Sequence, residues 1–133
     1  MARILVVDDS PEFRGLIEMT LQRAGHEPIG AEDGASGIHA AIVEQPEMIL
    51  LDYMMPDMNG QDVFRELRAN ENTSSIPVIM ITAFSNETDR IAMLRLGMDD
   101  FLTKPISPRD LVARVESLLY QKNNSGPRQV GSY

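Results

Sequence analysis

The amino-acid sequence predicts an α/β protein in which a five-stranded parallel sheet carries helices on both faces, a doubly wound (βα)5 arrangement. Short apolar runs alternate five times with longer segments in which apolar residues recur every three or four positions. The short runs are typical of buried strands, and the longer segments are typical of amphipathic helices. Their regular alternation favours parallel strands joined by right-handed helical crossovers.

The expected strands are apolar runs that end at polar residues or turns. They are Ile4–Val7, His26–Ala31, Met48–Leu51, Pro77–Ile81 and Phe101–Thr103. The second run contains Pro28, which has no backbone N–H to donate, so we expect this strand near an edge of the sheet.

The expected helices lie between these runs. They cover Pro11–Ala24, Asp33–Gln45, Gly60–Ala69, Asn86–Leu96 and a last segment that begins near Ser107. The first helix has clear start signals: Ser10 can cap it, Pro11 suits the first helical position and Glu12 suits the positive end of the helix dipole. Residues 121–133 are polar and aperiodic, so we expect one domain over residues 1–120, followed by a polar tail or the start of a linker.

The composition excludes several classes of function. A net charge of −8 argues against a nucleic-acid surface, which needs clustered Lys and Arg, so no direct contact with nucleic acid is expected. The chain has no cysteine and therefore no disulfide or thiolate chemistry. No apolar stretch approaches the roughly 20 residues of a membrane span, and we expect a cytoplasmic protein without membrane contact. His26 and His39 have no evident role and are expected on the solvated surface.

Polar residues follow four of the apolar runs at the point where each expected strand ends. Asp8 and Asp9 follow the first run, Asp52 the third, Thr82 the fourth and Lys104 the last. In doubly wound sheets the ligand site lies beyond the carboxyl ends of the strands, where the strand order reverses. We therefore expect these five side chains to form one site.

Three carboxylates in one cleft repel each other, by roughly 4 kcal/mol for two unit charges about 4 Å apart at an effective dielectric near 20. A divalent cation relieves that repulsion, and an all-oxygen site with few protein ligands suits Mg²⁺. Asp52 can then accept a phosphoryl group as a nucleophile, while Lys104 and Thr82 stabilise the phosphoryl oxygens. Taken singly, each residue is better explained as an ordinary turn, strand end or solvated lysine, and only the combination favours the site.

Four segments of the chain, in this order, resemble the receiver domain of bacterial response regulators, which belong to two-component systems. They are Val6–Asp9, Leu51–Gly60, Ile81–Ala83 and Asp99–Pro105. The resemblance covers roughly Arg3 to Tyr120 and implies a flavodoxin-like fold. It also implies a phosphorylation-dependent signalling switch that uses Mg²⁺ and receives its phosphoryl group from a histidine kinase or phosphotransfer protein.

The resemblance implies roles for individual residues. Asp52 would be the phosphoacceptor, Lys104 would contact the phosphoryl group, and the bond between Lys104 and Pro105 would be cis. The implied Mg²⁺ ligands are Asp8, Asp9, Asp52 and the backbone carbonyl of Met54.

The implied output is a small rearrangement rather than catalysis. Thr82 would be drawn toward the phosphoryl group, and Phe101 on the last strand would turn inward. Met54 and Phe84 are apolar at positions that are polar in many receivers and that flank the path of an attacking water. We therefore expect no turnover beyond slow self-dephosphorylation.

Charged residues of the fourth helix, last strand and fifth helix are similar to those through which winged-helix transcription regulators dimerise. They are Arg90, Asp99, Asp100, Asp110 and Arg114. Exposed ion pairs contribute only about 0–1 kcal/mol each. A homodimer through this face and a simply solvated charged face both remain open.

Three other interpretations fit the sequence less well. A phosphohydrolase of the haloacid dehalogenase type generally needs a second acid two residues after its nucleophile, where this chain has Met54. A flavodoxin-type flavin module needs a Ser/Thr/Gly-rich loop after the first strand, where this chain has Asp8–Pro11. The intact set of site residues disfavours an inactive receiver that serves only as a scaffold.

Overall fold

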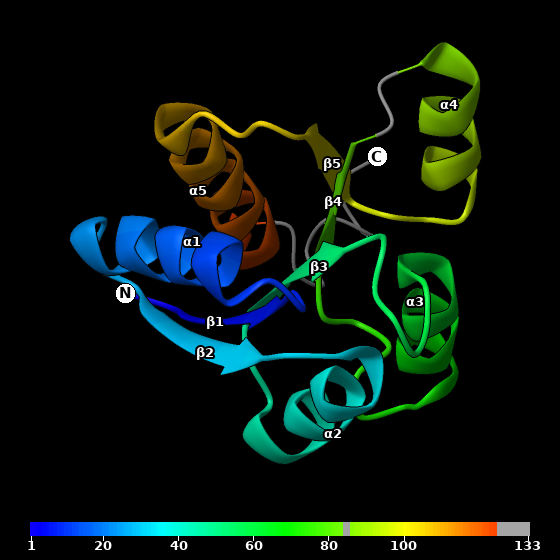
Figure 1. The fold of residues 1–133 in the computed structure, drawn as a ribbon. Coiled ribbons are helices and arrows are strands. Elements are labelled where there is room, and N and C mark those ends of the chain that lie inside the picture. Colours follow the sequence, from blue (N-terminus) through cyan, green and yellow to red (C-terminus); the bar gives the residue numbers. More distant parts are fainter. Residues whose placement is uncertain (84–85, 125–133) are drawn as a thin grey trace, which may run out of the picture.

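The computed structural model describes residues 1–83 and 86–124, which form one parallel sheet covered by helices (Figure 1). The strands are β1 (Arg3–Val7), β2 (Glu27–Ala31), β3 (Met48–Asp52), β4 (Val78–Thr82) and β5 (Asp100–Thr103). The helices are α1 (Pro11–Arg23), α2 (Gly34–Glu44), α3 (Gly60–Ala69), α4 (Glu87–Arg95) and α5 (Pro108–Asn124). The strand order is β2-β1-β3-β4-β5, with every pair parallel, so the predicted doubly wound fold is confirmed.

The sheet is buried on both faces. Helices α1 and α5 cover one face, and α2, α3 and α4 cover the other (Figure 1). Every residue of β3 and β4 is buried, as continuous apolar runs predict for central parallel strands. Strand β2, which contains Pro28, lies at an edge as expected.

Side-chain caps start the helices near the carboxyl ends of the preceding strands. The Ser10 hydroxyl accepts a hydrogen bond from the Phe13 N–H at 3.2 Å, as the sequence predicts for α1. Equivalent caps are Asp33 for α2, Asn59 for α3 and Asn86 for α4. The helix termini that follow β1 and β3 therefore lie next to the polar residues that end those strands.

The end of the last helix differs from the sequence-based expectation. Helix α5 continues past Tyr120 to Asn124, into the segment expected to be a tail, and residues 125–133 lie outside the described residues. On α4 the buried residue is Met93, whereas the apolar residues Ile91 and Leu94 are exposed. Among the described residues, no helix is both long and apolar enough to span a membrane.

The expectation that His26 lies on the solvated surface is wrong. The residue is buried, its Nδ1 accepts a hydrogen bond from the Ala2 N–H at 3.1 Å, and its Nε2 lies 2.6 Å from Glu116 Oε2 on α5. The ring thus joins the start of β1 to α5, a contact between segments 90 residues apart that local sequence does not reveal. His39 is exposed as expected.

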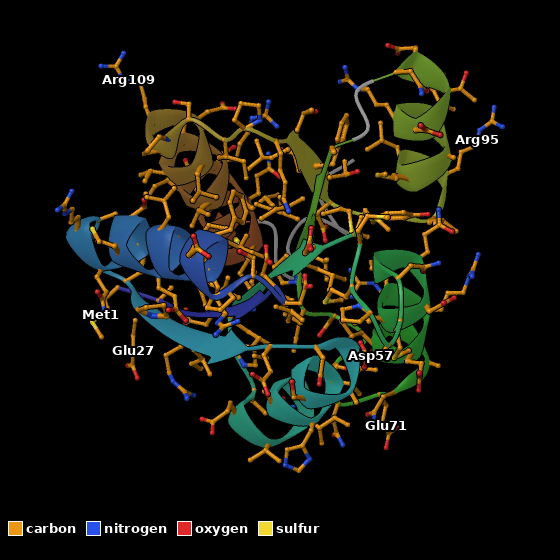
Figure 2. All side chains as sticks on the ribbon, viewed as in Figure 1. Met1, Glu27, Asp57, Glu71, Arg95 and Arg109 are labelled. Carbon is orange, nitrogen blue, oxygen red and sulfur yellow. The ribbon has the colours of Figure 1, made fainter. Side chains whose placement is uncertain are left out.

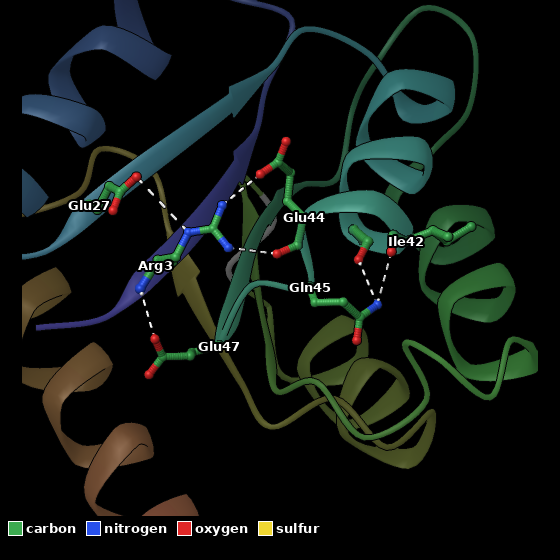
Figure 3. A network of polar contacts seen from close by, with 7 residues as sticks. Arg3, Glu27, Ile42, Glu44, Gln45 and Glu47 are labelled. Atoms are coloured by element: carbon green, nitrogen blue, oxygen red, sulfur yellow. Dashed lines mark hydrogen bonds and ion pairs between the residues drawn. The ribbon is translucent and has the colours of Figure 1, made fainter.

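The amino end of the sheet carries a surface network around Arg3 (Figure 3). The Arg3 guanidinium lies 2.6 Å from Glu44 Oε1 and 4.0 Å from Glu27 Oε2, and it donates to the Glu44 carbonyl at 2.7 Å. The Arg3 N–H donates to Glu47 Oε1 at 3.1 Å. Met1 and Glu27 mark this end of the molecule in Figure 2, and Asp57 lies on the opposite side, between α2 and α3.

Candidate functional site

Strand register brings the predicted site residues to one edge of the sheet. Val7 pairs with Leu51, so Asp8 and Asp52 follow at the ends of adjacent strands. Thr82 pairs with Thr103, the residue before Lys104. The chain leaves β1 toward β2 on one side and returns to β3 on the other, so Asp8 and Asp52 flank the point where strand order reverses.

The three acids form a cluster with an unsatisfied buried oxygen. One carboxylate oxygen from each of Asp8, Asp9 and Asp52 lies within 4.8 Å of the others. Asp8 is 1% and Asp52 3% exposed, while Asp9 is exposed. Asp8 Oδ1 accepts from the Ser10 N–H at 2.9 Å, whereas the buried Asp8 Oδ2 has no hydrogen-bond partner among the described residues.

An unpartnered buried carboxylate oxygen is unfavourable unless a cation or a donor compensates it. The nearest ammonium, Lys104 Nζ, lies 3.9 Å from Asp8 Oδ2 and does not satisfy it. All three carboxylates offer oxygen ligands, the type that Mg²⁺ prefers. The residues present therefore fit a magnesium ion.

Lys104 approaches the acids from the end of β5. Its Nζ lies 3.0 Å from Asp52 Oδ1 and 4.4 Å from the centre of the Phe13 ring on α1. Its backbone N–H donates to the Thr82 carbonyl at 2.8 Å, and the Lys104–Pro105 peptide bond is cis. One ammonium therefore faces three carboxylates, which leaves the cluster with an excess of negative charge.

Burial raises the pKa of both Asp8 and Asp52 above the usual aspartate value. The Ser10 N–H and the Lys104 ammonium oppose the rise in the pKa of Asp8. The Lys104 hydrogen bond opposes the rise in the pKa of Asp52, and the charge of Asp8 adds to it. Desolvation is thus the largest cause for both carboxylates, and the Lys104 ammonium offsets only part of it.

Of the two expected switch residues, Thr82 ends β4 beside this cluster, and Phe101 lies on β5, where it pairs with Met80. Thr82 is buried at the end of β4, one residue after Ile81, which pairs with Asp52. Phe101 is half-buried against the core beneath α4, and the Arg90 guanidinium lies 5.3 Å from the centre of its ring. Met54 is 63% exposed beside the site, and Phe84 lies outside the described residues.

Two residues near the site were not found from the sequence. Arg14 donates from its guanidinium to the Asp8 carbonyl at 2.6 Å and so fixes the backbone at the end of β1. Its spacing of one helical turn from Ser10 is a signal that could have revealed it, since it puts Arg14 over the same strand end. Asp57 lies within the resembling segment Leu51–Gly60, and no local pattern indicates its contacts with α2.

Comparison with known proteins identifies the class that this fold and site define. Residues 4–116 match the response regulator receiver domain. The chain belongs to this family, which confirms the prediction from the four segments. The family role is that of a phosphorylation-dependent signalling switch rather than a classical enzyme, and the family uses Mg²⁺ at an acidic aspartate site.

Curated relatives include single receivers and longer regulators. Protein PilH of Pseudomonas aeruginosa is 40% identical over 119 residues, covering 90% of this chain and 98% of PilH. The phosphate regulon transcriptional regulatory protein PhoB of the same species is 42% identical over 132 residues, covering 96% of this chain and 57% of PhoB. The chain spans about half the length of the transcriptional regulators that it matches.

Solved structures agree with the family assignment. A CheY-like receiver domain from Methanospirillum hungatei superposes with a TM-score of 0.86 at 25% identity, covering 95% of this chain and 99% of that one. The receiver domain of a Pseudomonas aeruginosa sensor histidine kinase superposes with a TM-score of 0.80 at 32% identity, covering 87% of this chain and 95% of that one. The latter structure holds a magnesium ion coordinated in its active site cleft.

Proposed function

We propose that Asp52 accepts a phosphoryl group from a histidine kinase or phosphotransfer protein. The observation that carries the proposal is the 3.0 Å contact between Asp52 Oδ1 and Lys104 Nζ, inside the carboxylate cluster at the reversal of strand order. In the transfer, an Asp52 oxygen forms a bond to phosphorus while the bond from phosphorus to the donor nitrogen breaks. The Lys104 ammonium already lies at Asp52 Oδ1, and from there it stabilises the negative charge on the phosphoryl oxygens.

We infer that Asp8, Asp9, Asp52 and the carbonyl of Met54 hold Mg²⁺, which when bound neutralises the carboxylates and the phosphoryl oxygens. The unpartnered Asp8 Oδ2 and the excess of carboxylates over ammonium support this assignment. Arg14 and the Ser10 N–H fix the orientation of Asp8 through its carbonyl and its other carboxylate oxygen.

The proposed switch uses Thr82, which ends β4, and Phe101, which lies on the neighbouring strand β5. Movement of the Thr82 hydroxyl toward a phosphoryl group on Asp52 would open space that the half-buried Phe101 ring can fill. Arg90 stacks on that ring, so the movement would also change the outer surface of α4. Aromatic NMR spectra with and without a phosphoryl mimic test this, and an unchanged Phe101 environment would contradict it.

We also propose that the phosphoryl group leaves Asp52 slowly by self-dephosphorylation. Met54 is largely exposed beside Asp52, where an apolar side chain cannot orient an attacking water. Met54→Asn should therefore release phosphate faster than the original chain, and the Met54→Asn, Phe84→Glu double variant faster still. Phosphate release from pre-phosphorylated protein measures this, and equal rates in all three proteins would refute it.

The charged face of α4, β5 and α5 is the proposed dimer surface. Arg114 donates to both carboxylate oxygens of Asp100, at 2.9 and 2.8 Å, and lies 3.6 Å from Asp110. These pairs are arranged across the face that carries Arg90 and could exchange partners with a second copy. Sedimentation of phosphorylated protein should detect a dimer that Arg114→Ala weakens, and a monomer under phosphorylating conditions would exclude it.

The central experiment compares the original chain with Asp52→Asn. Each protein is incubated with a small-molecule phosphodonor and Mg²⁺, and intact mass reports the uptake of one phosphoryl group. We expect uptake by the original chain and by Glu71→Gln, an exposed loop control, and no uptake by Asp52→Asn or in the presence of EDTA. Equal labelling of Asp52→Asn would disprove the assignment, and continuous turnover of the donor would indicate a phosphatase.

A further inference from the structure

The geometry points to Asp57 as a positioning residue for the metal site, because its carboxylate ties the loop that carries the Met54 carbonyl to the first turn of α2. This inference rests on the proposed magnesium site. The loop covers residues 53–59, between β3 and α3, and Asp57 is its one charged residue.

Asp57 reaches two backbone donors that α2 cannot satisfy itself. Its Oδ1 accepts from the Gly34 N–H at 2.9 Å, and its Oδ2 accepts from the Ala35 N–H at 3.0 Å. The first N–H groups of any helix lack partners within the helix. Helix α2 has no acidic residue in its own first turn, so the carboxylate of Asp57 adds to that of the N-cap Asp33 at the positive end of the helix dipole.

The helix cap of α2 completes the same arrangement. Asp33 accepts from the Ser36 N–H at 2.8 Å, so Asp33 and Asp57 together satisfy three successive N–H groups. The two hydrogen bonds to Asp57 hold its pKa below the usual aspartate value, which keeps it ionised. A carboxylate held by two donors in this way has a defined orientation rather than the freedom of a surface side chain.

The two ends of the loop are fixed by other contacts. The Tyr53 N–H donates to the Ile81 carbonyl at 2.9 Å, and the Gly60 N–H donates to the Tyr53 carbonyl at 2.7 Å. Between these ends Met54 is largely exposed, whereas Met55 and Met58 are partly buried and pack against the core. The path of the Met54 backbone therefore depends on what holds the middle of the loop.

The middle of the loop packs directly on the start of α2. A Cβ atom added to Gly34 would lie 3.0 Å from the Cβ and Sδ of Met58, so the absence of a side chain at residue 34 allows the loop to pack this closely on α2. The two hydrogen bonds to Asp57 hold the loop at this distance. Together these contacts position the loop and hence the Met54 carbonyl.

Removal of Asp57 should weaken Mg²⁺ binding without removing a ligand. Residues that orient metal ligands typically change metal affinity by about 10–100-fold when mutated. Since Asp57 acts on one backbone ligand of the proposed set, we expect about a 10-fold weaker affinity in Asp57→Ala. Asp57→Asn retains one acceptor oxygen and should be intermediate, which is the rescue expected of a positioning contact.

The test is a Mg²⁺ titration of the full chain by calorimetry, with amide NMR shifts of Tyr53 and Met54 as a second readout. Asp9→Asn removes one carboxylate from the proposed metal site and so tests whether Mg²⁺ binds at that site. Arg3→Gln is the matched control, because Arg3 donates to a carbonyl at the other end of α2 and does not contact the loop. We expect weaker binding in Asp57→Ala and Asp9→Asn and an unchanged affinity in Arg3→Gln.

The outcomes separate the inference from the function on which it rests. Unchanged affinity in Asp57→Ala with weakened binding in Asp9→Asn would overturn the positioning role and leave the metal site standing. Equal weakening in Arg3→Gln and Asp57→Ala would also overturn it, because general loosening of α2 would then explain both. Unchanged affinity in Asp9→Asn would overturn the proposed site together with the inference.

Discussion

At the amino end of the sheet, Arg3 is surrounded by three glutamates at the surface (Figure 3). At the carboxyl end, three aspartates lie together, and the Lys104 ammonium contacts two of them, Asp8 and Asp52. The side chains around Arg3 are partly exposed, at 38% for Arg3 and 43% for Glu44. Asp8 and Asp52 are almost completely buried. Both ends thus carry excess acid, but only one end removes it from water.

This difference in burial decides what each cluster can do. Solvent screens the charges around Arg3, so their repulsion is small and their pairs contribute little. Buried carboxylates lose hydration, and the unpartnered Asp8 oxygen has nothing to replace it. The carboxyl end is therefore unfavourable for folding and favourable for binding a cation, as expected where function opposes stability.

Helix α2 connects the two ends and is held at each by a residue from elsewhere in the chain. Asp57 accepts from its first N–H groups, and Arg3 donates to the Glu44 carbonyl in its last turn. The helix has no acidic residue in its first turn and no basic residue in its last. The two distant residues thus complement the helix dipole in the favourable sense at both ends.

The largest effect on this comparison is expected from Asp8→Asn. The amide keeps the Oδ1 acceptor for Ser10 and removes a buried charge, so the free energy of unfolding without Mg²⁺ should rise by about 1–2 kcal/mol. Denaturant unfolding in EDTA measures this, with the exposed Glu71→Gln as a control that should not change. A lower free energy of unfolding in Asp8→Asn would contradict the conclusion that the buried carboxylates destabilise the fold.

A smaller and opposite effect is expected at the amino end. Arg3→Gln should lower the free energy of unfolding by about 0.5–1 kcal/mol, because it removes partly exposed ion pairs. Added salt should reduce the loss. Unfolding in low and high salt measures both, and Arg65→Gln, which removes a single exposed 3.5 Å contact to Asp62, serves as the control. The same loss at both salt concentrations would contradict the surface character of the network.

The smallest effect is the acid dependence of the α2 contact. Hydrogen bonds from Gly34 and Ala35 lower the pKa of Asp57 from its usual value of 3.8. A lowered pKa in the folded state stabilises the fold above pH 3.8, and this stabilisation is lost as the pH falls through the folded-state pKa. The difference in thermal midpoint between the original chain and Asp57→Ala should therefore shrink below about pH 4. A constant difference down to acid pH would exclude ionic anchoring.

The sequence was sufficient for the strands and for the cluster at their ends. Parallel strands buried on both faces appear as continuous apolar runs, and their carboxyl ends lie at one edge, so Asp8, Asp52 and Lys104 could be grouped before any contact was known. The edge position of β2 followed from Pro28 for a similar local reason.

The contacts that escaped prediction join segments distant in the chain. Asp57 lies 23 residues from Gly34, and His26 lies 90 residues from Glu116. Neither pair has a local spacing that could reveal it, because the partners are chosen by how α2 and α5 pack on the sheet. Helix α4 buries Met93 and leaves its apolar residues Ile91 and Leu94 exposed.

The most direct test of the buried acidic end as a phosphoryl site is chemical trapping of the modified residue. Borohydride reduces an aspartyl phosphate to homoserine, which peptide mass spectrometry assigns to a single position. After incubation with a phosphodonor and Mg²⁺, we predict homoserine at residue 52 and none when EDTA replaces Mg²⁺. Homoserine at residue 8 or 9 instead, or stable phosphorylation without any conversion at residue 52, would contradict the assignment.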